Sequence, residues 1–217
     1  MLVHPWDAAL DEIEWREWHA DGHDFGQLAV NGSAGQPPTV VPTHFVVDEA
    51  CLLVHLARPN PVWHLLERAP DVLMSVVDDY AFIPGQWRKK PGSADEPAVP
   101  TSYYAAVQFA CRAEIVDDAV AKANLLRRQL AHFEPDRDPH DLDRPNYQRL
   151  LPGIRGLRLH IQSVTAKFKY DDQKPQTHRT SVAQQLAVRD QGRDRLAARQ
   201  QLLRLSRIGT WRDDAAT

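Results

Sequence analysis

The feature that most restricts the fold is a strict alternation of side chains between residues 105 and 115. One face of this stretch carries Ala105, Val107, Phe109, Cys111, Ala113 and Ile115, and the other carries Ala106, Gln108, Ala110, Arg112 and Glu114. A period of two over this length is typical of a β-strand with one buried and one wet face. Strands of this kind belong to antiparallel sheets and barrels, because strands of parallel sheets are covered on both faces.

Shorter segments of similar character surround this strand and are separated by turn residues. We predict further strands at residues 27–30, 42–47, 51–57, 72–77, 157–162 and 166–170. We predict helices at residues 7–20, 60–69, 117–133, 146–151 and 180–207. Short strands with appended helices fit a mainly β protein of the α+β class, built on a small antiparallel barrel.

Three of these helices carry more detailed predictions. Asp7 and Asp117 are favourable N-cap residues for the first and third helices, and Gly192 is a weak point in the last one. Helical spacing predicts that the third helix buries one apolar stripe, formed by Val120, Ala123, Leu126, Leu130 and Phe133.

The segment from His55 to Leu66 joins a strand to a helix through one cationic residue. Arg58 follows the apolar run, Asn60 is a favourable N-cap, and Pro61 suits the first helical position. Free backbone N–H groups and the helix dipole attract anions at such a start, and a guanidinium group fits phosphate. The pattern indicates a phosphate site; the plainer alternative is an ordinary turn with a solvated arginine.

Four motifs follow one another in a recognisable order. They are Thr43-His44, then His55-Leu56-Ala57-Arg58-Pro59-Asn60-Pro61, then Val99-Pro100-Thr101 with Tyr104-Ala105-Ala106-Val107, and finally Lys167-Phe168-Lys169. Their order and spacing resemble the PaiB-type FMN-binding proteins, a branch of the FMN-binding split-barrel group related to pyridoxamine 5'-phosphate oxidase-like flavoproteins. The similarity runs from about Thr39 to about Leu186.

This resemblance implies one FMN-binding split β-barrel domain over residues 1–217, with a variable N-terminal helix at 1–24 and a helical, basic tail at 177–217. It also implies FMN as cofactor, bound in a slot shared by the two chains of a homodimer. The expected cofactor-binding residues are Thr43, His44, His55, Ala57, Arg58, Asn60, Trp87, Thr101, Lys167 and Lys169. Each has a structural alternative, such as a half-buried strand histidine, a surface tryptophan or a solvated lysine stripe.

The chain departs from the family pattern at the far end of the expected pocket. Ser102-Tyr103 stands where the family has Trp-Asn, and Asp171-Asp172-Gln173 stands where it has Ser-Gln-Asn. Two acids near a phosphate repel it, so we expect an altered pocket end and slow flavin reduction by NADH or NADPH. The proline-rich loop at 84–100 is the natural lid.

Three functions are compatible with these residues. The first is a PaiB-type negative transcriptional regulator in which FMN is a structural or sensing ligand. The second is an FMN-dependent oxidoreductase, although no catalytic residue is identified. The third is a split barrel that holds another ligand such as haem through a histidine.

Charge limits the partners. The formal net charge of the chain is −3, which gives no general attraction to nucleic acid or anionic membrane. Residues 179–217 carry eight arginines and four aspartates, a net charge of +4, and the rest of the chain has a net charge of −7. Nucleic-acid contact through this tail is conceivable, but a helix with arginines on its wet side is the commoner explanation.

Composition favours a cytoplasmic protein. The two cysteines sit in apolar strands without a Cys-x-x-Cys pair, so we expect reduced thiols and no thiolate zinc site. The ten histidines show no metal-ligand spacing. No apolar window reaches the length of a membrane span, and the N-terminus lacks the pattern of a secretory signal.

Overall fold

The computed structural model describes residues 1–89, 98–209 and 211. The part of the predicted lid at residues 90–97 lies outside this range. The strands are β1 (Phe25–Val30), β2 (Thr39–His44), β3 (Val46–Asp48), β4 (Cys51–Ala57), β5 (Asp71–Ile83), β6 (Thr101–Val116) and β7 (Ile154–Lys169). The helices are α1 (Glu12–Ala20), α2 (Trp63–Arg68), α3 (Ala119–Phe133), α4 (Pro145–Gln148), α5 (Gln176–Arg189) and α6 (Asp194–Ile208). Short 3-10 turns lie at Pro5–Asp7, Gly85–Arg88, Pro139–Asp143 and Leu151–Gly153.

The strands form one seven-stranded sheet in the order β2-β1-β5-β6-β7-β4-β3. β1 pairs antiparallel with β2 and β5, and β4 pairs antiparallel with β3 and β7. The predicted alternation of β6 is confirmed from Val107 to Glu114, since Val107, Phe109 and Cys111 are buried and Arg112 and Glu114 are exposed, but Ala106, predicted on the other face from Ala105, is buried as well. The sheet is therefore half-buried along this strand, as an antiparallel sheet permits.

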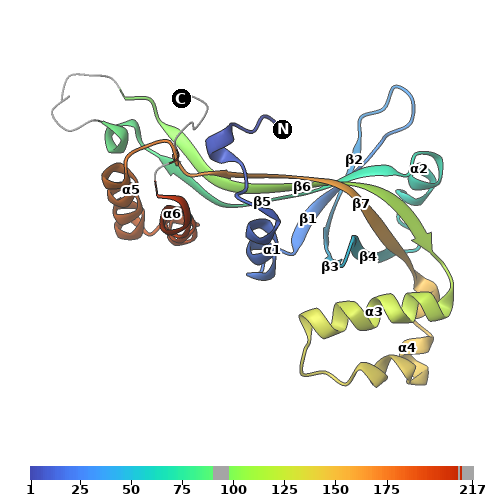
Figure 1. The fold of residues 1–217 in the computed structure, drawn as a ribbon. Coiled ribbons are helices and arrows are strands. Elements are labelled where there is room, and N and C mark those ends of the chain that lie inside the picture. The colour runs from blue at the N-terminus through green and yellow to red at the C-terminus, as the bar shows by residue number, and fades with distance from the viewer. Residues whose placement is uncertain (90–97, 210, 212–217) are drawn as a thin grey trace. The chain divides into compact units, whose positions relative to one another are not determined.

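The chain divides into two compact units, to which β5, β6 and β7 each contribute a part. The terminal unit comprises residues 1–18, 77–107 and 165–217, and the central unit comprises residues 19–76 and 108–164. In the terminal unit α5 and α6 lie side by side (Figure 1). Its core contains Tyr103, Phe168, Tyr170, Val182 and Leu186, and the core of the central unit contains Phe45, Leu52, Val54, Met74 and Leu157.

Several element boundaries differ from the predicted ones. The two strands expected at 157–162 and 166–170 form the single strand β7, and the strand expected at 42–47 breaks into β2 and β3. The helix expected at 180–207 begins at Gln176 and is interrupted between α5 and α6, where Asp190 and Gly192 adopt φ values of 48° and 55°. The weak point at Gly192 is thus a complete break, because both residues adopt the left-handed conformation.

The first helix starts later than predicted. Asp7 is not its cap; this residue lies in a 3-10 turn, is buried, and places its carboxylate 3.8 Å from Lys167 Nζ. Burial raises the pKa of Asp7, and Lys167 acts in the opposite direction. The charge partner is 160 positions away in the printed sequence, so local capping preference did not reveal it.

The third helix, α3, buries a different face from the predicted one. Its buried residues are Lys122, Ala123, Leu125 and Gln129, whereas Val120 is 68% exposed. Lys122 Nζ donates to the carbonyls of Leu151 and Ile154, and Gln129 Nε2 donates to that of Leu53. These bonds satisfy two long polar side chains inside the protein. The apolar stripe prediction is confirmed at Ala123 and wrong at Val120 and Phe133, which are exposed. The cap is Asp118 rather than Asp117, since Asp118 accepts from Ala121 N.

Within the described residues, no helix combines the length and the apolar character needed to cross a membrane.

Candidate functional site

Arg58 leaves the end of β4 as a cation with a fixed position. Its backbone N–H donates to Gly153 O at 2.8 Å, and its Nε donates to Pro152 O at 2.6 Å. Its Nη2 lies 3.2 Å from Asp117 Oδ1, while Nη1 has no hydrogen-bond partner among the described residues. The side chain is 47% exposed. Arg58 therefore presents an anchored guanidinium group with one nitrogen open to a ligand.

Asp117 is bound more tightly by another arginine than by Arg58. Arg155 Nε and Nη2 contact its two oxygens at 3.0 and 2.6 Å. The hydrogen bond from Arg155 is the main cause of the lowered pKa of Asp117. This bidentate pair already neutralises the charge of Asp117. The guanidinium group of Arg58 is therefore available to bind a stronger anion.

The turn after Arg58 differs from the predicted helix start. Asn60 Oδ1 accepts a hydrogen bond from Val62 N at 3.1 Å. The first carbonyl that accepts from the helix is that of Val62, which accepts from the N–H groups of Leu65 and Leu66. Val62 is consequently the N-cap, and α2 begins at Trp63 and spans six residues. The predicted cap position is wrong by two residues, and Arg58 is the main phosphate candidate of this segment.

His44 and His55 form a ring pair in the central unit. Their centroids are 5.4 Å apart in an edge-on arrangement, and the ring of Phe133 lies 5.0 Å from His44. His55 Nδ1 is 2.6 Å from Gln129 Oε1. Since Gln129 donates its amide to Leu53 O, its oxygen is the acceptor, so His55 donates from Nδ1. Burial lowers the pKa of His44, with a smaller contribution from His55.

Two other predicted residues of the central unit are backbone neighbours of these groups. Thr43 is buried and its hydroxyl donates to His44 O at 3.1 Å. Ala57 contributes its carbonyl, which accepts from Asn60 N and from Trp63 Nε1. Both therefore shape the local backbone in the described structure.

The remaining predicted residues belong to the terminal unit, where three of them form one group. Lys169 Nζ donates to Thr101 Oγ1 at 2.9 Å, and Lys167 Nζ donates to Leu2 O at 2.9 Å. Both ammonium groups lie over the ring of Tyr104, at 5.7 and 5.8 Å from its centroid. Trp87 is engaged differently, because the guanidinium of Arg189 covers its ring at 4.7 Å.

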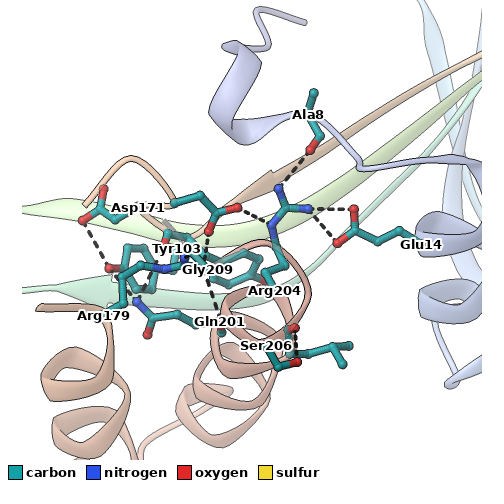
Figure 2. A network of polar contacts seen from close by, with 12 residues as sticks. Ala8, Glu14, Tyr103, Asp171, Arg179, Gln201, Arg204, Ser206 and Gly209 are labelled. Atoms are coloured by element: carbon teal, nitrogen blue, oxygen red, sulfur yellow. Dashed lines mark hydrogen bonds and ion pairs between the residues drawn. The ribbon is translucent and has the colours of Figure 1, made fainter. Parts of the chain in front are cut away.

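The terminal unit also contains a buried polar network that the sequence did not predict (Figure 2). Arg204 binds Asp172 Oδ2 at 2.6 Å and both oxygens of Glu14 at 2.6 and 2.7 Å, and Arg179 pairs with Asp172. The side chains of Arg204, Asp172, Glu14 and Arg179 are all at most 1% exposed. The expectation of a wet arginine face is therefore wrong for Arg179 and Arg204.

Asp171 lies at the edge of the same network. Arg88 contacts its carboxylate at 3.2 and 3.3 Å, and Tyr103 donates its hydroxyl to it at 3.2 Å. Burial raises the pKa of Asp171, but the partners, with His178 foremost, outweigh burial and the pKa is lowered. Asp171 also has a φ of 57°, an uncommon conformation for a residue other than glycine. Both acids face arginines, which compensate their charge within this network, and their repulsion of a bound anion stays a prediction.

Solved structures place this architecture in the split-barrel class of α+β proteins, and the fold class predicted from the sequence is confirmed. A "putative 5-nitroimidazole antibiotic resistance protein" from Bacteroides thetaiotaomicron superposes with a TM-score of 0.58 and 14% identity, over 74% of this chain and 85% of that chain. An FAD and heme binding protein from Mycobacterium smegmatis superposes with a TM-score of 0.57 and 16% identity, over 75% and 73%.

Residues 2–163 match the family described as "Putative FMN-binding domain", and the chain belongs to this family. The protease synthase and sporulation protein PAI 2 of Bacillus subtilis is 28% identical over 144 residues, which cover 64% of this chain. The match spans 66% of that relative's length, just under two thirds. The predicted resemblance to PaiB-type proteins is therefore confirmed as a distant relationship.

Proposed function

We propose that this protein binds FMN as a homodimer and acts as a PaiB-type regulator in which the flavin is a sensing or structural ligand, with residues 1–217 forming one split-barrel domain. The observation that carries the proposal is Arg58: an anchored, half-exposed guanidinium group with an open Nη1, inside the family-matched segment. When bound, FMN supplies redox chemistry at its ring system. The protein's own groups bind and orient it.

The aromatic rings around His44 are our proposed contact surface for the isoalloxazine ring of the flavin. His44 and Phe133 offer flat surfaces, and burial keeps His44 neutral at physiological pH. A neutral imidazole stacks without a desolvated charge and still offers a hydrogen bond. Thr101, Lys167 and Lys169 remain our proposed rim groups, since their two ammonium groups gather on one strand face.

The dimer is supported by an exposed apolar stripe on β5. Val77, Tyr80 and Phe82 are 62%, 53% and 48% exposed. Three large apolar side chains along one strand are unusual at a permanently wet surface. Burial against the same stripe of a second copy suits a two-fold interface.

The regulatory role rests on the relationship to PAI 2. This relationship does not require that the protein itself binds a specific DNA sequence. The described part of the basic tail also offers few unpaired positive charges for contacts with phosphate groups. Arg179, Arg189, Arg195, Arg204 and Arg207 are each paired with a carboxylate. We therefore propose that any nucleic-acid contact is weak and declines steeply with salt.

The first test is the visible spectrum and mass of the purified full chain mixed with FMN. We expect flavin absorption that remains with the protein after gel filtration, one FMN per chain, and a dimer by light scattering at micromolar concentration. A monomer that retains FMN would refute the shared site. Protein that retains no flavin would refute the cofactor.

A second candidate is haem binding, which the neutral state of His44 favours, because an axial histidine binds iron through an unprotonated nitrogen. The same spectrum decides between the two. A Soret band after mixing with haem, together with no retained FMN, would replace the flavin proposal.

A further inference from the structure

Cys51, His160 and Glu114 form a hydrogen-bonded relay on the face of the central unit. Cys51 Sγ lies 3.3 Å from His160 Nδ1, and His160 Nε2 lies 2.8 Å from Glu114 Oε2. The three side chains come from the neighbouring strands β4, β7 and β6. A thiol next to an imidazole that a carboxylate orients is the arrangement that activates a sulfur nucleophile. Cys51 is half-buried and His160 is 51% exposed, so reagents can reach them.

The relay is not shaped for a metal ion. His160 uses one ring nitrogen for the thiol and the other for the carboxylate, so the three donors do not point at one centre. Across the described part of the chain, no group of three or more histidines, cysteines and acids is placed to hold a metal.

A groove of about 540 Å³ adjoins the relay on the same face of the sheet. It is lined by Asp48, Leu53, Asn124, Leu125, Arg127, Arg128, Ala131 and Arg158. In the β4–β7 register Leu53 pairs with Arg158 and Cys51 pairs with His160. Directly paired residues face the same side of a sheet, and two residues along a strand span about 7 Å. A ligand in the groove therefore reaches the sulfur with one short extension.

The lining of the groove suits a small organic anion. Each of its three arginines forms an ion pair with a partly exposed acid. The pairs are Arg127 with Asp143, Arg128 with Asp48 and Arg158 with Glu114. Exposed pairs of this kind are weak and exchange readily. Leu53, Leu125 and Ala131 add apolar lining to the same groove. Carboxylate groups on an uncharged skeleton match this combination.

The two thiols of the chain differ in reactivity. Burial raises the pKa of Cys111 to about 12, and Cys111 is 1% exposed. Burial also raises the pKa of Cys51, with Asp48 adding to it, so this thiol is protonated at rest. Its reaction therefore needs a base in contact, and His160 is that base.

We propose that Cys51 is a site of reversible thiol–disulfide exchange with disulfides that carry carboxylate groups. His160 accepts the thiol proton as Sγ attacks one sulfur of the bound disulfide. The S–S bond of the ligand breaks, a mixed disulfide forms on Cys51, and the leaving thiolate takes the proton from His160. The disulfide is the only oxidant, so one thiol is consumed and one is released.

The test compares two disulfides on the full chain: the dianionic 5,5'-dithiobis(2-nitrobenzoate) and the uncharged 2,2'-dithiodipyridine. We expect one fast equivalent with each, assigned to Cys51 by peptide mass, and no fast phase in Cys51→Ser. His160→Asn should slow both reagents about a hundredfold, the lower end of the usual contribution of a positioned base. His64→Asn, at an exposed position on α2, should change neither rate.

The groove is tested by charge. Arg127→Gln should slow the dianionic reagent several-fold and leave the uncharged one unchanged, whereas Arg112→Gln, which removes an exposed arginine of the same unit, should affect neither. Equal effects of Arg127→Gln on both reagents would refute the anion specificity. Labelling of Cys51 no faster than Cys111, or an unchanged rate in His160→Asn, would refute the relay.

Discussion

Replacing Arg204 with alanine is expected to lower the free energy of unfolding by about 3–5 kcal/mol, the usual cost of removing one partner from a buried ion pair. Arg204 is 1% exposed and binds Asp172, Glu14 and the carbonyl of Ala8. Its loss leaves the Glu14 carboxylate buried without a cation. The bonded groups lie just after β7, near and on α1, and on α6, so the variant also removes one of the links between the N-terminal and C-terminal segments, while the Arg207–Glu17 pair remains.

The measurement is urea unfolding followed by far-ultraviolet circular dichroism. Arg195→Ala is the matched control, because Arg195 lies on the same helix but is 74% exposed in its pair with Asp190. Exposed pairs contribute about 0–1 kcal/mol. Arg204→Met separates the effect of the lost charge from the effect of the lost packing, because methionine retains most of the buried side-chain volume. If Arg204→Ala cost no more than Arg195→Ala, the network would have no structural role.

The parts of the fold that depend on local pattern were predictable. β4 was predicted with its observed bounds, because a short apolar run ends abruptly at Arg58. The half-buried β6 followed from its alternation of side chains, and the weak point at Gly192 followed from poor helix propensity, although the helix was predicted to continue through it. In each case the decisive information lies within a few neighbouring residues.

The parts that depend on distant partners were not predictable. Lys122 and Gln129 reverse the expected burial of α3 because they donate to carbonyls of Leu151 and Leu53. Asp172 reads as a surface acid in sequence, yet two arginines from α5 and α6 enclose it. Periodicity places apolar residues well, but it cannot reveal a buried polar group whose partner lies elsewhere in the chain.

The candidate site shows the same division. Arg58 was predicted as a cation beside a strand end, and it is one. Its anchors, Pro152 and Asp117, lie 94 and 59 positions away, so only the fold reveals that its guanidinium is held in place. The companion Gln129, which fixes the ring of His55, was missed because it lies on a helix predicted to bury apolar residues only.

Arg58→Ala is expected to weaken FMN binding by about 1.5–3 kcal/mol, the range for a hydrogen bond to a charged group. This corresponds to a rise in Kd of about 10- to 150-fold. The reason is specific to phosphate, because Nη1 of Arg58 is the open donor at the end of β4 while Nε and Nη2 hold the protein. Riboflavin, which lacks the phosphate, should bind the variant almost as well as it binds the parent protein.

The comparison is made by titrating FMN and riboflavin, separately, with the parent protein and the variant while flavin fluorescence is followed. Arg68→Ala is the control for charge, since Arg68 ends α2, is exposed, and donates to Ser33 Oγ at 3.1 Å. It removes the same charge from the same stretch of chain but should leave both affinities within about twofold, as expected for a screened surface charge. Equal losses of FMN and riboflavin in Arg58→Ala would place the phosphate elsewhere, and a loss in Arg68→Ala as large as that in Arg58→Ala would reduce the effect to general electrostatics.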